Sequence, residues 1–427
     1  MRIAFIGLGA MGLPMARQIA LAGNAQLTLF DVRQEQLERA QGLGRLASSL
    51  PDAVAGADAV FSVVPADRQV AAVVDEMLPV THPGQVYVDF STIGPRTMQH
   101  AADRLAGAGV ITVGAGMTQS IDGATTGTLV LFMGGPDELP SVIGPAIGAM
   151  ASEVRMVGSV GAAKSLKLIN NMLNASINIA VSEALVLGRQ VGLTYEETAF
   201  ALRDHGADSW PLQNHTIKHV LPNDLGPGFF STNYLMKDLK LGIGMLTELG
   251  LPAPFAGLAL SYLRGSAAHG HGDDYHMIVV RWLEQGANAS GGAGPMTSAW
   301  RGDQRQAEVT LVRAVAALQT LYSLDAVNVL HHLDVAPLDV ARHFEAGSAG
   351  NDSLRALQRH LEGAAAVQTP SGLLDDFERV LELASDTETP GTAFELGRQV
   401  TLGLSERFGR DVNLWDLPQL AAPGRRG

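Results

Sequence analysis

Cysteine is absent from the 427 residues of this chain. The absence excludes disulfide bonds, thiolate nucleophiles and cysteine-based zinc sites. Long hydrophobic runs are absent as well, because no uncharged stretch reaches the length of about 18 residues that a membrane span needs. The apolar N-terminus superficially resembles a signal peptide, but three glycines interrupt it. We therefore expect a soluble, cytoplasmic protein without a membrane partner.

Positive charge is in short supply. The chain has 30 Lys and Arg against 43 Asp and Glu, which gives a formal net charge of -13. Nucleic acids and anionic membranes both require a basic surface, so this charge argues against either as a partner. The rest of the composition, 46% hydrophobic and 17% charged, is that of an ordinary globular protein long enough for two or three domains.

A glycine-rich turn stands at the start of the chain. The apolar residues Ile3–Ile6 run into Gly7, Gly9 and Gly12, and a helical pattern follows over Met15–Leu21. This spacing lets the backbone turn sharply and approach a pyrophosphate without interference from a Cβ atom. The phosphates would lie at the helix N-terminus, where the helix dipole favours negative charge. The alternative is a glycine turn that binds nothing.

An acidic residue after the second predicted strand supports dinucleotide binding. Asp31 follows that strand and lies at a distance of about 20 residues from the glycine turn, where a carboxylate binds the ribose hydroxyls. Asp31 would repel a 2′-phosphate, which favours NAD over NADP as the cofactor. Arg33 weakens this preference, because an arginine just past the strand could bind that phosphate instead.

Strand-like and helix-like segments alternate over residues 1–160. This alternation predicts an α/β domain with a doubly wound parallel sheet of the Rossmann type. The predicted strands are Ile3–Ile6, Leu27–Phe30, Ala59–Val64, Gln85–Asp89, Ile111–Val113 and Thr128–Met133.

Beyond Gly161 the pattern is helical. Residues 162–202 form one long apolar-periodic stretch, and the chain is helical again after a Gly- and Ala-rich segment that has no periodicity. We therefore expect a cofactor-binding domain over residues 1–160, an all-α substrate and catalytic domain over 161–285, a linker over 286–305, and a second helical domain over 306–420.

The second helical domain is similar to a degenerate copy of the first. Glu183–Glu197 aligns with Asp325–Asp339, and Leu235–Leu239 aligns with Leu373–Phe377. The offset changes by four residues between Glu197 and Leu235, and Leu251-Pro252 and Asp273 then fall opposite Thr389-Pro390 and Asp411. Two unrelated amphipathic arrays can also be slid into such a register, so chance similarity remains the alternative to duplication.

A lysine and an amide share one face of the helix that begins near Gly161. Lys167 and Asn171 are four residues apart, so their side chains project together. A lysine on an apolar helix can exchange a proton with a substrate oxygen, and partial burial beside Lys164 would favour its neutral form. The spacing alone equally allows both lysines to be solvated residues near a helix start.

Six motifs recur in order along roughly residues 1–285. They are Gly7–Ala16, Val63–Pro65, Asp89–Ile93, Gly123–Leu129, Gly158–Leu173 and Leu235–Leu239. Together they resemble the β-hydroxyacid dehydrogenases, the family of 3-hydroxyisobutyrate dehydrogenase, tartronate semialdehyde reductase and relatives of 6-phosphogluconate dehydrogenase.

The resemblance implies a role for each matched residue. Lys167 would be the general acid/base, with Asn171 beside it as a second catalytic-site residue. The substrate would bind Thr118, Gln119, Ser120 and Asn170, with its carboxylate at the 118–120 loop. The cofactor would bind Gly7, Leu8, Gly9, Met11, Gly12, Asp31, Val64, Pro65, Thr92 and Lys237. These roles imply an NAD(P)-dependent oxidoreductase that acts on a small 3-hydroxy acid or the corresponding semialdehyde.

The substrate loop departs from the family pattern. Members of the family usually have Ser-Gly-Gly where this chain has Thr118-Gln119-Ser120. Glycines let backbone amides approach a carboxylate closely, whereas Gln119 brings a bulky polar side chain into that space. We therefore expect a substrate that is larger or more hydroxylated than hydroxyisobutyrate.

The second helical copy lacks the catalytic groups. In the alignment, Val309, Arg313 and Asp375 take the places of Lys167, Asn171 and Lys237. We expect this copy to be structural and to replace, within one chain, the partner subunit against which the family's helical domain packs. The expected assembly is a monomer with an internal pseudo-dimer, or a homodimer.

Two other functions remain open at this point: an imine reductase, which usually has Asp or Tyr in place of Lys167, and a non-catalytic dinucleotide sensor or scaffold. His269, His271 and His276 could form a metal cluster, but a solvated loop is the simpler interpretation and we expect no metal. Trp210 could face the substrate or anchor the core.

Overall fold

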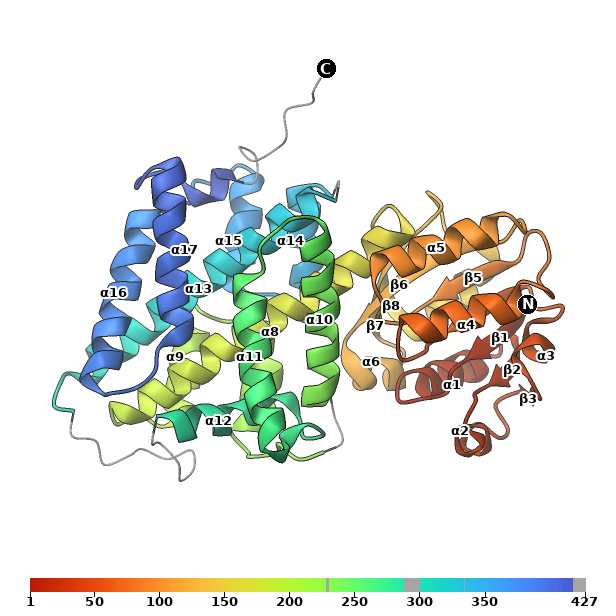
Figure 1. Ribbon diagram of the computed structural model, residues 1–427, viewed down its shortest axis with the longest axis horizontal. Coiled ribbons are helices and arrows are strands. Elements are labelled where there is room, and N and C mark those ends of the chain that lie inside the picture. The colour runs from red at the N-terminus through yellow and green to blue at the C-terminus, as the bar shows by residue number, and fades with distance from the viewer. Residues whose placement is uncertain (228–229, 288–299, 334, 418–427) are drawn as a thin grey trace, which may run out of the picture. The chain divides into compact units, whose positions relative to one another are not determined.

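The computed structural model describes residues 1–227, 230–287, 300–333 and 335–417. The chain divides into two compact units, Met1–Leu168 and Ile169–Gly427. The first unit holds a β-sheet with its covering helices, and the described part of the second is helical apart from isolated bridges (Figure 1). This arrangement confirms the predicted fold class.

The first unit is built on one eight-stranded sheet with the order β3-β2-β1-β4-β5-β6-β7-β8. All neighbouring strands are parallel except β6 and β7. The order changes direction between β1 and β4, and doubly wound sheets bind their ligands at such a switch point. The strands are β1 (Arg2–Ile6), β2 (Gln26–Phe30), β3 (Arg45–Leu46), β4 (Ala59–Ser62), β5 (Val86–Asp89), β6 (Ile111–Thr118), β7 (Leu129–Gly134) and β8 (Ala151–Met156).

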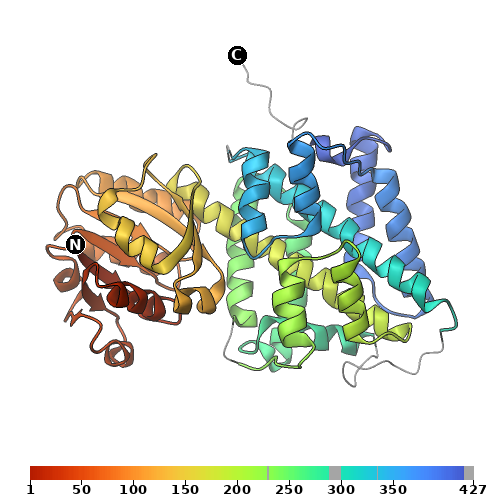
Figure 2. The same ribbon diagram turned by 180° about the vertical axis from the view of Figure 1, so that it is seen from behind.

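Helices cover both faces of this sheet and enclose two apolar cores (Figures 1 and 2). On one face, α1 (Gly12–Ala22) and α7 (Gly144–Met150) pack on the strands. On the other face lie α3 (Leu50–Val54), α4 (Asp67–Met77) and α5 (Pro95–Ala106). Because both faces are covered, β4, β5 and β7 are buried along their whole length, as parallel-sheet strands usually are.

The sheet is larger and less uniform than the sequence predicts. The six predicted strands are present, but β3 and β8 were not predicted, and the antiparallel pair β6–β7 contradicts a wholly parallel sheet. Strand β6 also continues five residues past its predicted end at Val113, because Gly114 and Gly116 resemble a loop in sequence. Strand β8 alternates exposed and half-buried residues and so lacks the continuous apolar run that marks its neighbours.

The second unit contains two helical arrays in succession (Figure 1). We define α8 to α12 as the first array and α13 to α17 as the second. Helix α8 (Val160–Gln190) begins in the sheet unit. The others are α9 (Tyr195–Asp204), α10 (Thr232–Glu248), α11 (Pro254–Ser266), α12 (Val279–Gly286), α13 (Gln304–His331), α14 (Pro337–Ala346), α15 (Asp352–Leu361), α16 (Pro370–Asp386) and α17 (Thr392–Phe408).

The single helical stretch predicted over residues 162–202 is in fact two helices. Helix α8 ends at Gln190, and Gly192 takes a left-handed conformation with φ of 91°. Thr194 then starts α9 with a capping box, in which its hydroxyl accepts from the Glu197 backbone N–H and the Glu197 carboxylate accepts from the Thr194 backbone N–H. Local capping therefore overrides the continuous apolar periodicity.

Several helices of the first array have counterparts in the second at nearly constant spacing. Helix α14 begins 142 residues after α9, as Pro337 does after Tyr195. The spacing is then 138 residues from α10 to α16 and from α11 to α17. The 3₁₀ turn at Leu414–Asp416 likewise follows the one at His276–Ile278 by 138 residues. These bounds agree with the register, and with the four-residue change of offset, in the predicted alignment.

The arrays contact each other through a reciprocal pair of loops. Ser209 forms an antiparallel bridge with Asn351, which is its own counterpart at the spacing of 142 residues. The Trp210 N–H donates to the Gly350 carbonyl at 2.7 Å, and the Asp352 N–H donates to the Asp208 carbonyl at 2.9 Å. Asp352 is the counterpart of Trp210, and Gly350 is the counterpart of Asp208, so the two hydrogen bonds are equivalent. Equivalent contacts of this kind are typical of a local two-fold axis.

Most of the predicted linker, and the end of the chain beyond Leu417, lie outside the described residues. The first array ends at Gly286 with α12, and the second begins at Gln304 with α13. Among the residues that the structure describes, no helix combines the length and apolar character that crossing a bilayer requires.

Candidate active site

The predicted cofactor and substrate residues of the sheet unit follow the ends of five strands. Strands β1, β2, β4, β5 and β6 are mutually parallel, so their carboxyl ends share one edge of the sheet. The residues placed at this edge are Gly7, Leu8, Gly9, Met11 and Gly12 after β1, Asp31 after β2, Val64 and Pro65 after β4, Thr92 after β5, and Thr118, Gln119 and Ser120 at the end of β6.

The glycine turn has the geometry that a pyrophosphate requires. A Cβ atom on Gly7, whose φ is 90°, would lie 2.1 Å from the Val63 carbonyl oxygen, and one on Gly12 would lie 1.9 Å from that of Gly7. A Cβ atom on Gly9 would meet only the end of the Arg33 side chain, 3.9 Å away. Gly7 and Gly12 therefore permit the tight turn, and Gly9 leaves open the space that a phosphate would enter.

Asp31 is tied to the glycine turn. Its carboxylate accepts the Leu8 N–H and the Arg33 N–H, both at 2.8 Å. The Arg33 guanidinium lies 3.8 Å from the same carboxylate and is mostly exposed. An ionised carboxylate can accept about four hydrogen bonds, so Asp31 keeps acceptor capacity for two ribose hydroxyls.

The loops after β4 and β5 are joined by hydrogen bonds. The Val64 N–H donates to the Ser91 hydroxyl at 2.9 Å, and that hydroxyl donates to the Asp89 carboxylate at 2.9 Å. Pro65 follows Val64 and Thr92 follows Ser91, so the two predicted cofactor segments are held side by side.

Lys164 anchors this pair of loops to α8. Its side chain is 1% exposed, and its ammonium lies 2.8 Å from the Asp89 carboxylate and from the Asp89 and Ser91 carbonyls. It also lies 2.9 Å from the Ala115 carbonyl on β6. Burial lowers the pKa of Lys164, and the neighbouring Asp89 carboxylate opposes that shift. The interpretation of Lys164 as a solvated residue is therefore wrong; it binds β5, β6 and α8 together.

Lys167 is placed against β6, beside the substrate loop. A Cβ atom on Gly116 would lie 2.9 Å from the Lys167 Cβ and 3.0 Å from the Ala163 carbonyl. One on Gly114 would lie 2.5 Å from the Val160 carbonyl. Gly114 and Gly116, which make the second half of β6 resemble a loop in the sequence, thus allow the first turns of α8 to lie on this strand. Gly116 is only two residues from Thr118.

The substrate loop keeps a glycine-like backbone without glycine. Gln119 has φ of 81° and Ser120 has φ of 55°, and both are conformations that glycine adopts freely and other residues seldom do. Strain of this kind costs on the order of 1–3 kcal/mol and collects at functional sites. Gln119 and Ser120 therefore hold a backbone conformation typical of glycine at the two positions where the resemblance leads us to expect glycine.

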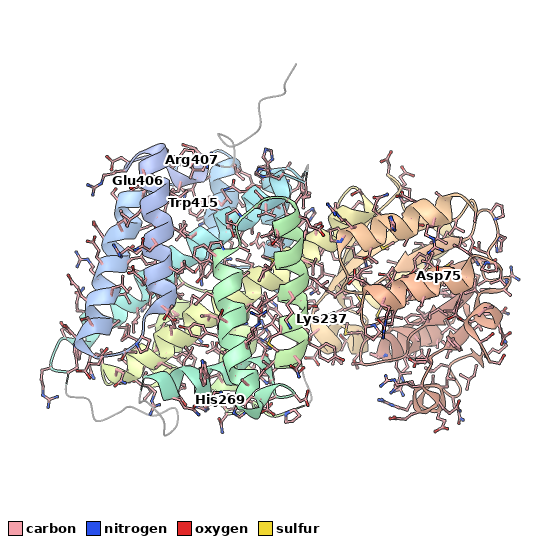
Figure 3. The ribbon with its side chains drawn as sticks, viewed as in Figure 1. Asp75, Lys237, His269, Glu406, Arg407 and Trp415 are labelled. Carbon is pink, nitrogen blue, oxygen red and sulfur yellow. The ribbon has the colours of Figure 1, made fainter. Side chains whose placement is uncertain are left out.

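In the helical unit, Asn171 and Lys237 meet at a residue that was not singled out. Asp238 is 3% exposed and accepts the Asn171 side-chain amide at 2.6 Å. The Lys237 ammonium lies 3.1 Å from the same carboxylate; Figure 3 labels Lys237 on α10. Asp238 stands in the motif Leu235–Leu239, and its position directly after the lysine was the available signal.

Three further asparagines on α8, Asn170, Asn174 and Asn178, are buried and form a polar stripe along this helix. Asn170 donates to the Ser348 hydroxyl at 2.8 Å, and Asn174 donates to the Ser348 carbonyl at 2.6 Å. Asn178 donates to the Asn174 side chain at 2.9 Å. Ser348 lies in the loop between α14 and α15, which nothing in the resemblance pointed to because that loop belongs to the second array.

A group of aromatic side chains borders the stripe. The Asn174 amide donates to the His215 imidazole at 3.4 Å, and the other ring nitrogen of His215 contacts the Tyr275 hydroxyl. Burial lowers the pKa of His215 well below its usual value and that of His276 to about 4, so both rings are neutral near pH 7. The Trp210 ring packs edge-on against His215 with centroids 5.1 Å apart. Trp210 therefore borders this polar network as well as the reciprocal loop contact.

The three histidines considered as a metal site do not converge. His271 pairs with Asp274 at 2.7 Å, and His276 is buried against the Phe230 carbonyl. The His269 ring packs on Trp282, on the turn after α11 (Figure 3). Within the described residues, no group of three or more His, Asp or Glu side chains has metal-binding geometry.

The second array has different residues at the counterparts of the candidate site residues. Arg313 and Asp376, the counterparts of Asn171 and Asp238, form an ion pair at 2.7 Å. Val309 replaces Lys167 and is exposed. The counterparts of the buried amides Asn170, Asn174 and Asn178 are Val312, Ala316 and Thr320, at the spacing of 142 residues.

Two family models match the chain in succession. The model for the NAD binding domain of 6-phosphogluconate dehydrogenase matches residues 2–158. The model described as NAD-binding of NADP-dependent 3-hydroxyisobutyrate dehydrogenase matches residues 161–283. The two matches span the sheet unit and the first array, and they end before the second array.

Curated relatives match the same part of the chain. NAD-dependent L-serine dehydrogenase from Pseudomonas aeruginosa is 31% identical over 294 residues, which cover 66% of this chain and 98% of the relative. 2-(Hydroxymethyl)glutarate dehydrogenase from Eubacterium barkeri is 29% identical over 297 residues, covering 68% of this chain and 98% of the relative.

Solved structures extend the likeness. A structure of Mycobacterium tuberculosis 3-hydroxyisobutyrate dehydrogenase with L-serine is 28% identical, with a TM-score of 0.62 and coverage of 66% of this chain and 98% of the other. Plasmodium falciparum 6-phosphogluconate dehydrogenase is 13% identical, with a TM-score of 0.71 over 95% of this chain and 93% of the other. At that identity the likeness concerns the fold alone, but it includes the second array.

Proposed function

Because the chain belongs to the β-hydroxyacid dehydrogenase family, we propose that it oxidises the hydroxyl group of a small 3-hydroxy acid, or reduces the matching semialdehyde, with Lys167 as the general acid/base. The family makes it an NAD(P)-dependent hydroxyacid dehydrogenase. One observation carries the assignment of the base: Lys167 lies on α8 against Gly116, two residues before the substrate loop.

Lys167 takes the hydroxyl proton as the alcohol is oxidised and returns it in the reverse direction. A bound nicotinamide supplies the redox chemistry, as the acceptor or donor of hydride. Asn171 orients the substrate while its amide stays fixed on Asp238. Thr118, Gln119 and Ser120 receive the substrate carboxylate, in a loop whose last two residues have a positive φ. Holding the reacting groups in line supplies much of the rate enhancement.

The residues at the strand ends fit a dinucleotide, and we propose NAD as the preferred form. Gly7, Gly9 and Gly12 would hold the pyrophosphate, and Lys237 would reach the cofactor from α10. Asp31 would accept the ribose hydroxyls and repel a 2′-phosphate. Because the Arg33 guanidinium is 3.8 Å from that carboxylate, it reduces the repulsion without replacing the acid.

The second array takes the place of a partner subunit in this proposal. The reciprocal contact at Ser209 and Asn351, with the matching helix bounds, supports a duplication in which only one copy kept the catalytic residues. The domain boundaries expected from the sequence remain part of the proposal. The protein would then act as a monomer with an internal pseudo-dimer.

The replacement Lys167→Ala tests the proposal. We expect kcat to fall by roughly 100- to 10,000-fold with 3-hydroxy acids, because the proton acceptor is lost. Binding of the nicotinamide cofactor, followed by its fluorescence, should be unchanged. The matched control is Val309→Ala in the second array, which should leave turnover within about two-fold. Normal turnover by Lys167→Ala would refute the role of the lysine, and absence of turnover by the unmodified protein would favour a sensor.

A further inference from the structure

Strands β5 and β6 separate at the edge of the sheet where the candidate site lies. They pair as far as Asp89 and Gly114. Strand β5 ends there and the chain leads on to Thr92, whereas β6 continues to Thr118 along β7. The ladder between the two strands therefore stops where the predicted cofactor and substrate segments begin.

The Lys164 ammonium lies in the fork between these strands. It donates to the carbonyls of Asp89 and Ser91 at 2.8 Å, on the side of β5, and to the carbonyl of Ala115 at 2.9 Å, on β6. A further contact at 2.8 Å goes to the Asp89 carboxylate. A lysine ammonium has three N–H donors, and most of its acceptors here are backbone carbonyls. The side chain thus joins the two segments where the strand ladder has ended.

The Asp89 carboxylate extends this connection. It accepts the Ser91 N–H at 3.1 Å, the Ser91 hydroxyl at 2.9 Å and the hydroxyl of Ser62, on β4, at 2.6 Å. Replacing a buried ion pair by apolar residues of similar volume is often neutral or stabilising. Stability alone therefore does not account for two charges buried at this point.

The second array shows that the helical scaffold does not need a buried cation here. Gln306 is the counterpart of Lys164 on α13 and is exposed. The buried cation occurs in the copy that carries Lys167.

The segment after β5 lies on the nicotinamide side of the proposed cofactor site. The strand order reverses between β1 and β4, with the glycine turn after β1 and Asp31 after β2. A dinucleotide binds across such a reversal. With its adenosine ribose at Asp31 and its pyrophosphate at the glycine turn, the other half would extend toward the ends of β4 and β5.

We propose that Lys164 is a positioning residue for hydride transfer, which holds the segment after β5 and the substrate strand β6 in fixed relation to the helix that carries Lys167. This inference rests on the proposed function. Lys167 follows Lys164 by three residues on α8, a rise of about 4.5 Å, so the ammonium is fixed within one turn of the proposed base. Because its side chain is 1% exposed, Lys164 acts through these segments and not on the substrate itself.

A single-turnover experiment separates positioning from folding. With the enzyme in excess over NAD and the hydroxy acid saturating, the NAD is bound to folded enzyme, so the rate constant of NADH formation does not depend on the folded fraction. We expect Lys164→Gln to lower this rate constant by about 10- to 100-fold, because misplacing the reacting groups by about 1 Å has an effect of this size. The glutamine side chain is one bond shorter and has only two N–H donors.

Leu105→Ala is the matched control for lost stability. Leu105 is 0% exposed in the core of the same unit and lies near the end of α5 that is remote from the candidate site. This replacement also destabilises the protein, but the single-turnover rate constant should stay within about two-fold.

A second variant keeps the test informative if Lys164→Gln does not fold. That replacement leaves the Asp89 carboxylate buried without a cation. The double variant Asp89→Asn/Lys164→Gln removes both charges and should show a loss of rate constant of the same size.

Cofactor binding gives a readout that does not require turnover. ADP-ribose lacks the nicotinamide, so Lys164→Gln should leave its dissociation constant unchanged in calorimetry. The dissociation constant of NADH should rise by about three- to ten-fold, an effect equivalent to one lost hydrogen bond.

An unchanged single-turnover rate constant would overturn the proposal, since Lys164 would then be structural. Equal losses of ADP-ribose and NADH binding would overturn it as well. If the unmodified protein turned over no 3-hydroxy acid, the proposed function would fail instead, and the two dissociation constants would still decide whether Lys164 positions the segment after β5.

Discussion

The first and second helical arrays have corresponding helices at nearly constant spacing, but they differ in what they bury along their longest helix. In α8 the stripe after Lys167 holds Asn170, Asn174 and Asn178, whereas the same stripe of α13 holds Val312 and Ala316 before Thr320. Both helices pack into the same kind of array, so the helical scaffold tolerates either content. The helical scaffold therefore does not require the polar stripe.

The comparison also separates two kinds of acidic residue. Asp238 and its counterpart Asp376 both face the long helix of their array, where they bind Asn171 and Arg313. Both acids are buried, but the first binds a buried amide and the second pairs with an exposed guanidinium. The acid is therefore present in both arrays, while its partner differs between a buried amide and an exposed cation.

The largest contrast is expected at the start of the two long helices. Lys164→Met leaves the buried Asp89 carboxylate without its cation and should lower the unfolding free energy by about 3–5 kcal/mol. Gln306, the counterpart of Lys164, is exposed. Gln306→Met should therefore change the unfolding free energy by less than about 0.5 kcal/mol. Chemical denaturation of both variants measures the difference, and similar small losses would show that Lys164 does not anchor α8.

The two arrays can also be compared through the pH dependence of the unfolding free energy. Glu183 is buried and accepts the Tyr262 hydroxyl at 2.8 Å and the Ala393 N–H at 3.0 Å; burial raises its pKa from 4.5 to about 7. A raised carboxyl pKa in the folded state stabilises the protein fully below about pH 4.5, and this stabilisation is lost as pH rises through 7. The change corresponds to on the order of 3 kcal/mol.

Glu183→Gln should therefore flatten the decline of the unfolding free energy between pH 5 and 8. Asp325, the counterpart of Glu183, also has its pKa raised to about 7 by burial. Asp325→Asn should flatten the decline in the same direction. Unfolding curves at several pH values measure both slopes. A slope unaffected by either replacement would mean that neither acid is protonated on folding.

The smallest effects are expected at the reciprocal loops. The Ser209 hydroxyl accepts the Leu212 N–H at 3.2 Å, and the Asn351 Oδ1 accepts the Leu354 N–H at 3.0 Å, so both residues cap the start of a helical segment. Ser209→Ala and Asn351→Ala should each cost about 1 kcal/mol of unfolding free energy. Losses that differ by several-fold in denaturation experiments would contradict the equivalence of the two loops.

Local sequence signals predicted the sheet, the glycine turn and the repeat of the helices. The turn was predictable because its requirements, three glycines between a strand and a helix, lie within a dozen residues. Strand β8 was missed because neither of its faces is continuously apolar. Helix α8 was extended too far because apolar periodicity continues through the break at Gly192.

The missed parts of the site depend on contacts between distant segments. Lys164 pairs with Asp89, 75 residues away, so the sequence alone could not distinguish this lysine from a solvated one. Ser348 contacts Asn170 across 178 residues and lies outside every matched motif. The proposed role of Lys167 itself came from resemblance, since spacing alone left it equal to a surface lysine.

The pairing of Ser209 with Asn351 has a consequence for how this protein tolerates dilution and mutation. Between separate subunits such a contact dissociates as the protein becomes scarce, whereas within one polypeptide the two loops stay at a fixed effective concentration. In a symmetric dimer every replacement also occurs twice, once on each side of the axis. Here it occurs once, so the two sides of the interface can diverge independently.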